Sequence, residues 1–294
     1  MPEVAPIHHQ SLLSETKAML RAAGLQARKG LGQHFLVDGA YLKHILGAAE
    51  LGADDKVIEV GPGLGVLTRA LAERAGHVLA VEKDTNLSTL LTATFSENDH
   101  VQIVNQDILK ADLAELGQRL GVTRSTQYKV VANLPYYITS PVLRLFLEAN
   151  LKPERLVVMV QKEVARQITA RPGDMSLLTV GIQLYGEPKI IKYVPARAFY
   201  PPPDVDSAIL KIAVFPKPRV DVETGTFFTL VRAGFSSARK QIANSLSNRL
   251  GLPKEEVLCL LASAGVDPRR RAETLSIEEW GRLWQEYHKL GGGL

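Results

Sequence analysis

The first half of the chain carries a succession of short, apolar, β-branched runs, each of which ends at a polar residue. Three of these runs end at Glu82, Asp107 and Asn133, and an earlier run, 56–60, leads into the glycine-rich turn 61–65. Helical segments separate the runs, and this alternation predicts a doubly wound α/β domain with a mainly parallel sheet. Because parallel strands end at the same edge of a sheet, we expect the polar residues to line a ligand crevice there.

The glycine-rich turn joins the first of these strands to a helix that begins at Val66. Gly61 and Gly63 allow the backbone to approach a ligand closely at the amino end of that helix. Glu82 follows at about the distance at which an acidic residue of a nucleotide site meets ribose hydroxyls. Val66 departs from the dinucleotide pattern G-x-G-x-x-G. The turn alone therefore leaves both a nicotinamide cofactor and S-adenosylmethionine open.

The run that ends in Asn133-Leu134-Pro135-Tyr136 predicts a strand that presents a loop suited to an exocyclic amine. The Asn133 side-chain oxygen and the Leu134 carbonyl can both accept from an NH2 group, because Pro135 restricts the neighbouring backbone. Tyr136 can stack on the aromatic ring that carries the amine. The lone pair of an adenine amine is delocalised, so two acceptors would raise its reactivity without a strong base. An ordinary strand exit capped by an asparagine is the alternative interpretation.

Two further segments predict loops beside this site. Segment 27–38 has two glycines and a basic pair and predicts a loop that covers a bound cofactor, with a helix from about Tyr41. Segment 198–207 contains three consecutive prolines, which fix an extended loop. Phe199 at its mouth is either a plug in the core or a second stacking face for a target base.

Several local signals specify the remaining elements. Ser140 is expected to cap a helix that begins at Pro141, and Ser276 with Glu279 forms a capping box. Two stretches, about 177–194 and 205–215, are predicted to be β-rich.

The organisation of domains follows from changes in pattern along the chain. The proline-containing segment 216–218 ends the β-rich part, and the remainder has helical periodicity. We expect a polar lead-in over 1–24, an α/β domain over 25–216 and a small helical domain over 217–294.

Composition excludes several classes of protein. The chain has 294 residues and a net charge of +4, with a pI near 9.1. It contains no apolar run long enough to span a bilayer, and residues 1–10 lack the layout of a signal peptide, so we expect a cytoplasmic protein. Its one cysteine, Cys259, offers neither a disulfide nor a zinc cluster, and we expect it to be buried on a helix.

The densest basic groups lie in the predicted helical domain, at Arg239-Lys240 and at Arg269-Arg270-Arg271. Runs of this kind are usually solvated surface, but their position would suit contact with a folded RNA.

Taken together, these motifs resemble the small-subunit (16S) ribosomal RNA adenine dimethyltransferase family (KsgA/RsmA). The resemblance extends from about residue 27 to residue 250. It rests on the 31–36 loop, the 59–65 turn, Asn133-Leu134-Pro135-Tyr136, Gln161-Lys162-Glu163 and the 199–207 proline loop, which occur in the order of the family.

The resemblance implies a Rossmann-like class I methyltransferase fold and methyl transfer from S-adenosylmethionine to N6 of two adjacent adenosines. These adenosines lie in a hairpin near the 3′ end of the small-subunit rRNA, and the implied partner is the immature small subunit. The implied protein is a monomer that needs no metal. By motif, Asn133, Leu134, Tyr136 and Phe199 would act on the target base, and the cofactor would contact His34, Leu36, Gly61, Gly63, Glu82, Asp107 and Asn133.

Two alternatives remain open. One is the related family that methylates large-subunit rRNA, which shares the fold and the loop at Asn133. The other is an RNA-binding factor of ribosome assembly that has lost methyl transfer. An intact Asn133 and an intact glycine turn argue against that loss.

Overall fold

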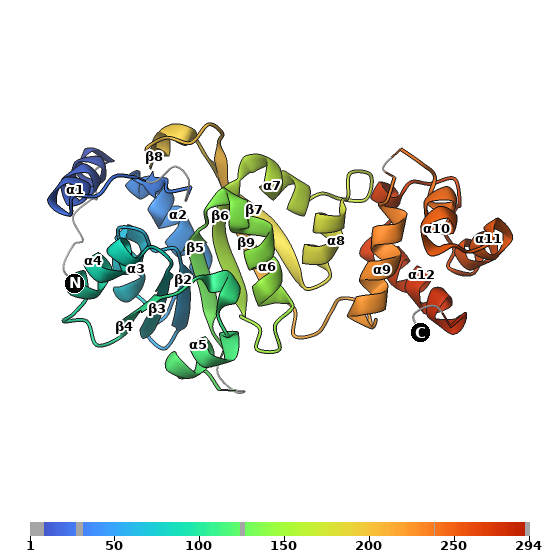
Figure 1. Cartoon of the computed structure of the whole chain (residues 1–294), viewed down its shortest axis with the longest axis horizontal. Coiled ribbons are helices and arrows are strands. Elements are labelled where there is room, and N and C mark those ends of the chain that lie inside the picture. The colour runs from blue at the N-terminus through green and yellow to red at the C-terminus, as the bar shows by residue number, and fades with distance from the viewer. Residues whose placement is uncertain (1–8, 28–31, 124–126, 238, 292–294) are drawn as a thin grey trace. The chain divides into compact units, whose positions relative to one another are not determined.

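A computed structural model describes residues 9–27, 32–123, 127–237 and 239–291 of the chain (Figure 1). Helix α1 (His9–Ala22) lies within the lead-in that the sequence predicts. The first eight residues of the lead-in, and Arg28-Lys29-Gly30-Leu31 of the predicted covering loop, lie outside the described residues.

The chain divides into two compact units, one of residues 1–165 with 189–214 and the other of 166–188 with 215–294. Segment 166–188, which the sequence assigns to the α/β domain, thus belongs to the second unit. Two backbone hydrogen bonds join this segment to the rest of the second unit. The N–H groups of Gly173 and Met175 donate to the Glu273 carbonyl over 2.9 and 3.1 Å. The boundaries predicted from the sequence stay a prediction.

A seven-stranded sheet in the order β4-β3-β2-β5-β6-β9-β7 confirms the predicted doubly wound architecture (Figure 1). Pairing is parallel from β4 through to β6, and β9 runs antiparallel to β6. The chain adds β3 and β4 on one side of β2 and then returns to place β5 on the other side. The switch point of the topology therefore lies between β2 and β5, where α/β sheets bind ligands. The strands are β2 (Lys56–Val60), β3 (His77–Glu82), β4 (Val101–Asn105), β5 (Lys129–Asn133), β6 (Arg155–Gln161), β7 (Gly186–Val194) and β9 (Ser207–Val214).

Helices α2 (Gly39–Ala49) and α3 (Val66–Ala72) contribute to a core cluster with one face of this sheet. Every second residue of a strand points to the same face, and buried Val131 and Val157 contribute to this cluster from neighbouring strands. Leu46 and Leu71 are buried against them from the helices. Burial of one such side chain contributes about 1.5–3 kcal/mol. The core therefore fixes the strands whose ends build the site.

Three helices of the first unit begin where an aspartate supplies a cap. The carboxylate of Asp84 accepts from the Asn86 backbone N–H at the start of α4 (Thr85–Thr94), and Asp38 and Asp112 cap α2 and α5 (Leu113–Arg119) in the same way. The other connecting helices are α6 (Thr139–Leu147) and α7 (Lys162–Ile168).

Two local predictions are wrong. Residues 177–183 form helix α8 (Leu177–Gln183) and not a strand, because Ser176 and Thr179 make a capping box that starts a helix despite the β-branched residues. Helix α6 has Ile138 at its cap position, so Ser140 is already helical. Its start is set by the short 3-10 helix η3 (Tyr136–Ile138), which runs directly into it.

The helical part of the second unit confirms the predicted small helical region. The capping box at Ser276 and Glu279 is present, and Trp280 is fully buried in the core. Cys259 is exposed, and the prediction that it is buried is wrong, because Val257 and Leu260 occupy the buried face of its helix. The helices are α9 (Thr224–Gly234), α10 (Ile242–Leu250), α11 (Lys254–Ser263) and α12 (Ile277–Lys289).

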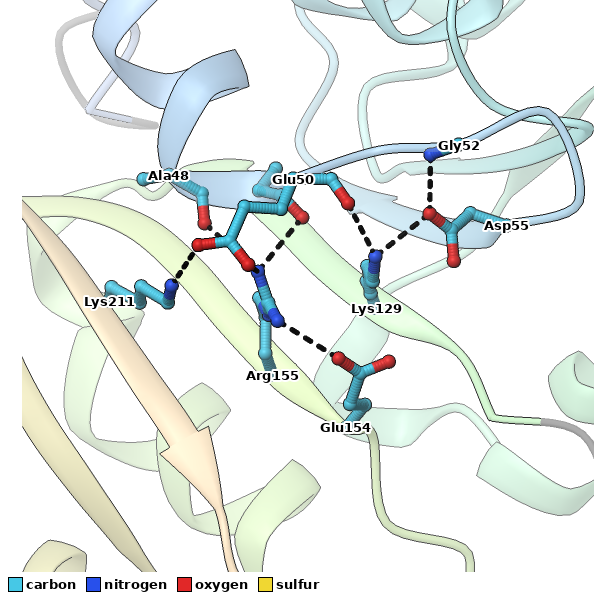
Figure 2. Close-up of polar contacts among 9 residues, drawn as sticks. Ala48, Glu50, Gly52, Asp55, Lys129, Glu154, Arg155 and Lys211 are labelled. Atoms are coloured by element: carbon cyan, nitrogen blue, oxygen red, sulfur yellow. Dashed lines mark hydrogen bonds and ion pairs between the residues drawn. The ribbon is translucent and has the colours of Figure 1, made fainter.

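A network of charges holds the amino ends of β5 and β6 to the end of α2 (Figure 2). The Glu50 carboxylate binds Arg155 and Lys211, each over 2.5 Å. Lys129 donates to the Glu50 carbonyl and to Asp55, each over 2.8 Å. The hydrogen bonds from Lys211 and Arg155 lower the pKa of Glu50 to about 2. The network lies at the edge of the sheet opposite to the carboxyl ends, so it stabilises the sheet without occupying the site.

Replacement of Arg155 tests this network, because its side chain is only 14% exposed and its guanidinium joins Glu50 to Glu154. Arg155→Met is expected to lower the free energy of unfolding by about 1–3 kcal/mol, measured by urea denaturation. The control is Arg119→Met, which breaks an exposed pair with Glu115 and should cost less than about 0.5 kcal/mol. Equal losses in both variants would contradict a structural role for the network.

Candidate active site

A cavity opens at the carboxyl ends of β2, β3 and β5, on the first unit, and holds about 1290 Å³ of empty space including its mouth. This is the edge where the switch point of the sheet predicts a ligand. All ten residues that the sequence assigns to the cofactor or the target base line this one cavity. They are His34, Leu36, Gly61, Gly63, Glu82, Asp107, Asn133, Leu134, Tyr136 and Phe199.

The glycine turn forms one wall of the cavity. Gly61 and Gly63 have φ of +66° and +60°, a backbone conformation that residues other than glycine rarely adopt. A Cβ at Gly63 would lie 3.0 Å from the Phe35 ring. The Gly63 N–H donates to Glu82 Oε2 over 3.1 Å, and the Gly61 N–H donates to the Val81 carbonyl over 3.0 Å. The turn is thereby fixed to the end of β3.

Glu82 is 7% exposed, and each of its oxygens accepts one backbone hydrogen bond. The second bond comes from the Asp84 N–H over 2.8 Å. Burial raises the pKa of Glu82. A carboxylate oxygen has two lone pairs, so each oxygen retains acceptor capacity for a hydroxyl group of a ligand.

Asp107 lies two residues beyond the end of β4 and caps the 3-10 helix η2 (Ile108–Lys110). Its Oδ1 accepts from the Leu109 N–H over 3.1 Å, and its Oδ2 pairs with Lys83 Nζ over 2.9 Å. The hydrogen bond from Lys83 lowers the pKa of Asp107. Asp107 therefore presents an ionised, oriented carboxylate at the cavity.

Asn133 is oriented by a segment 99 residues away in the chain, because its Nδ2 donates to the His34 carbonyl over 2.9 Å. A carbonyl oxygen only accepts, so the amide nitrogen must face His34. The Asn133 Oδ1 is thereby left to accept from a ligand. The Leu134 N–H donates to the Met159 carbonyl over 3.2 Å and fixes the next peptide.

Tyr136 stands beside Asn133 and is fixed at its ring and at its hydroxyl. Its ring stacks on that of His34 with centroids 6.1 Å apart and 22° between the planes. Its hydroxyl is 2.7 Å from Oγ of the fully buried Ser207. Burial raises the pKa of Tyr136. Sequence reasoning missed the role of Ser207, and its place at the end of the proline loop was the only available signal.

The proline loop and the covering loop are joined to each other. Strand β1 (Phe35–Leu36) pairs antiparallel with β8 (Phe199–Tyr200), and His34 Nδ1–H donates to the Pro201 carbonyl over 2.8 Å. Phe199 is only 3% exposed and belongs to the core cluster, although it lines the cavity. Of the two roles that the sequence allowed for Phe199, the structure shows packing in the core, and stacking of its ring on a base stays a prediction.

Glu59 also lines the cavity, and sequence reasoning did not single it out. It is 1% exposed on β2, and its Oε2 has no hydrogen-bond partner among the described residues. Burial raises the pKa of Glu59 to about 8. An acidic residue inside an otherwise apolar strand was the signal in the sequence, since such a side chain is buried at a cost.

The two predicted basic clusters differ in their surroundings. Each arginine of the 269–271 run pairs with an acidic neighbour, and Arg270 binds Glu279 through its two terminal guanidinium nitrogens. Arg239 and Lys240 are exposed, and within the described part of the chain neither forms an ion pair.

Among the described residues, no group of three or more His, Cys, Asp or Glu is arranged to hold a metal ion. No described helix is long and apolar enough to cross a membrane.

The raised pKa of Glu59 predicts how stability depends on pH. The folded chain retains the Glu59 proton up to about pH 8, whereas the unfolded chain releases it near the ordinary glutamate pKa of 4.5. The contribution of Glu59 to the free energy of unfolding should therefore be greatest below the pKa of this residue in the unfolded chain. It should fall as the pH rises toward the pKa of this residue in the folded chain.

Glu59→Gln removes the titrating proton, so the free energy of unfolding of this variant should fall less between about pH 5 and pH 8 than that of the wild type. The two decreases, measured by urea denaturation at both pH values, should differ by roughly 3–5 kcal/mol. Glu97→Gln, at an exposed position, serves as the control. Parallel pH profiles for Glu59→Gln and the wild type would contradict the raised pKa.

Comparison with known proteins identifies relatives along nearly the whole chain. The model of the family described as ribosomal RNA adenine dimethylase matches residues 24–289. A ribosomal RNA small subunit methyltransferase A of Dehalococcoides mccartyi is 53% identical over 282 residues, 94% of either chain.

Solved structures agree on the fold. The structure of ErmE, a 23S rRNA methyltransferase, is 31% identical, with a TM-score of 0.67 over 86% of this chain and 98% of its own. A dimethyladenosine transferase from Plasmodium falciparum is 24% identical, with a TM-score of 0.76 over 88% of this chain and 98% of its own.

Proposed function

Because the chain belongs to the ribosomal RNA adenine dimethylase family, we propose that it dimethylates N6 of two adjacent adenosines in small-subunit (16S) rRNA, with S-adenosylmethionine as the methyl donor. The single observation that carries this proposal is the orientation of Asn133, whose amide oxygen is directed away from the His34 carbonyl. An amide oxygen in this place accepts from an exocyclic amine, which is the group that the reaction modifies.

The residues around the cavity fit S-adenosylmethionine. Glu82 has acceptor capacity for the ribose hydroxyls, the glycine turn leaves space that side chains would fill, and Asp107 can accept from the adenine amine. When bound, the cofactor supplies a methyl group on a positively charged sulfur.

The contribution of the chain to the chemistry is mainly positioning. Asn133 Oδ1 and the Leu134 carbonyl would accept the two N6 hydrogens and draw the nitrogen toward tetrahedral geometry. Tyr136 would hold the plane of the base, since its ring is fixed by His34 and Ser207. Asn133 is neutral, and a singly methylated amine still has one N–H to donate, so a second round uses the same contacts.

Two observations favour the small subunit over the large subunit as the source of the RNA. The relative named for the small subunit is 53% identical and covers 94% of either chain, whereas the large-subunit enzyme ErmE is 31% identical. We expect a monomer that acts in the cytoplasm on the immature small subunit during its biogenesis. A factor that binds RNA without catalysis is disfavoured by the oriented Asn133 and the intact glycine turn.

The amine-acceptor role predicts a specific kinetic defect. Asn133→Ala should slow the chemical step by roughly 100-fold or more and weaken RNA binding much less, because its contact matters most in the transition state. Single-turnover assays with mass spectrometry of the product nucleosides measure both methylations. Asn98→Ala, at an exposed position outside the cavity, should behave as the wild type. Dimethylation by Asn133→Ala at the wild-type rate would refute the role.

The surroundings of the two basic clusters predict different effects on RNA binding. Joint replacement of Arg239 and Lys240 by alanine should weaken RNA binding, with cofactor affinity unchanged. It should also reduce the salt slope, which is the slope of log K against log salt concentration, by about 2. Arg270→Ala should instead lower thermal stability, because it breaks the bidentate pair with Glu279. An unaltered salt slope in the double variant would leave Arg239 and Lys240 as ordinary solvated surface.

A further inference from the structure

Tyr137 is an aromatic side chain left largely in solvent at the mouth of the cavity. It is 57% exposed, although it directly follows Tyr136 and lines the same cavity. A large aromatic ring contributes little to folding when it is exposed to this extent. An exposed ring beside a site for a nucleobase is therefore a surface on which a ligand can bind.

The backbone that carries Tyr137 is fixed before any ligand arrives. The short helix η3 is closed by hydrogen bonds from Ile138 to the Pro135 carbonyl and from Thr139 to the Tyr136 carbonyl. A Cβ at Gly32 would lie 3.5 Å from the Tyr137 ring, so the ring stands against the described part of the covering loop. Rigid aromatic groups bind at a low entropic cost.

Tyr136 and Tyr137 face different directions. Successive residues of a 3-10 helix are turned by about 120°. Accordingly, the Tyr136 hydroxyl reaches the fully buried Ser207, while Tyr137 is exposed. A base held by Tyr136 inside the cavity would leave the ring of Tyr137 at the mouth, in reach of the next nucleotide.

A cation lines the same cavity. Lys83 is 56% exposed and pairs with Asp107, and it lines the cavity together with Tyr137. An exposed aromatic ring and an ammonium group at one cavity combine a stacking surface with a contact for phosphate, as in binding sites for single-stranded RNA.

We propose that Tyr137 is the stacking platform for the nucleotide adjacent to the target adenosine. This inference rests on the proposed function, since a target base swung into the cavity exposes one face of its neighbour. Tyr137 covers that face and holds the strand in place during transfer. The ligand is thus an unpaired nucleobase of the substrate RNA, distinct from the base that Tyr136 holds.

The test uses a hairpin RNA whose loop carries two adjacent adenosines, one of them replaced by 2-aminopurine. This base lacks the 6-amino group that the proposed acceptors bind, so the unmodified adenosine is the favoured target and the probe takes the neighbouring position. Binding of the full-length wild type should quench its fluorescence by stacking. Tyr137→Ala should abolish the quenching and weaken RNA binding roughly 5- to 100-fold. Tyr137→Phe should retain both, because stacking does not need the hydroxyl.

Tyr193→Ala removes another exposed tyrosine, 44% exposed and outside the cavity, and should leave quenching and affinity unchanged. Equal quenching by Tyr137→Ala and the wild type would overturn the inference. Failure of the wild type to methylate the unmodified hairpin, either free or within the immature small subunit, would instead overturn the proposed function. Urea denaturation should give the same midpoint for Tyr137→Ala and the wild type, because the ring is largely exposed, and this result shows that the variant is folded.

Discussion

The parallel pairing of β2 with both β3 and β5 is the constraint on which the site depends. It brings Val60, Val81 and Asn133 to one edge of the sheet, although they come from three separate parts of the chain. Backbone hydrogen bonds and the core behind the sheet fix this edge with little help from the loops. The charge network around Glu50 acts at the opposite edge, so stabilisation and ligand binding occupy different ends of the same strands.

The loops then complete the site through a few neutral hydrogen bonds. Asn133 binds the His34 carbonyl, His34 binds the Pro201 carbonyl and Tyr136 binds Ser207. These bonds join the covering loop, the proline loop and the end of β5 into one wall. None of them requires a charged group, which agrees with a reaction in which the methyl donor carries the charge and the protein aligns the amine.

Sequence reasoning located most of this site because strand ends and glycine turns have strong local signals. Glu82, Asp107 and Asn133 each follow an apolar run, and parallel topology was enough to bring them together. Ser207 and Glu59 were missed because their roles depend on burial and on partners distant in the chain. The same limit explains Cys259, whose exposure depends on which face of its helix packs inward.

Local signals failed where a competing one was stronger. The β-branched residues of 177–183 favour a strand, but the capping box at Ser176 starts a helix. In the basic run 269–271, tertiary structure pairs Arg270 with the carboxylate of Glu279, and contact of the run with RNA stays a prediction. Pairing between distant residues cannot be read from the composition of a run.

Transfer of isotopically labelled methyl groups from S-adenosylmethionine, with immature small subunits and large subunits offered separately, tests the account most directly. Mapping by mass spectrometry should find N6,N6-dimethyladenosine at two adjacent positions near the 3′ end of the small-subunit rRNA and no label in the large subunit. Label confined to large-subunit rRNA, or no transfer to either particle, would contradict it.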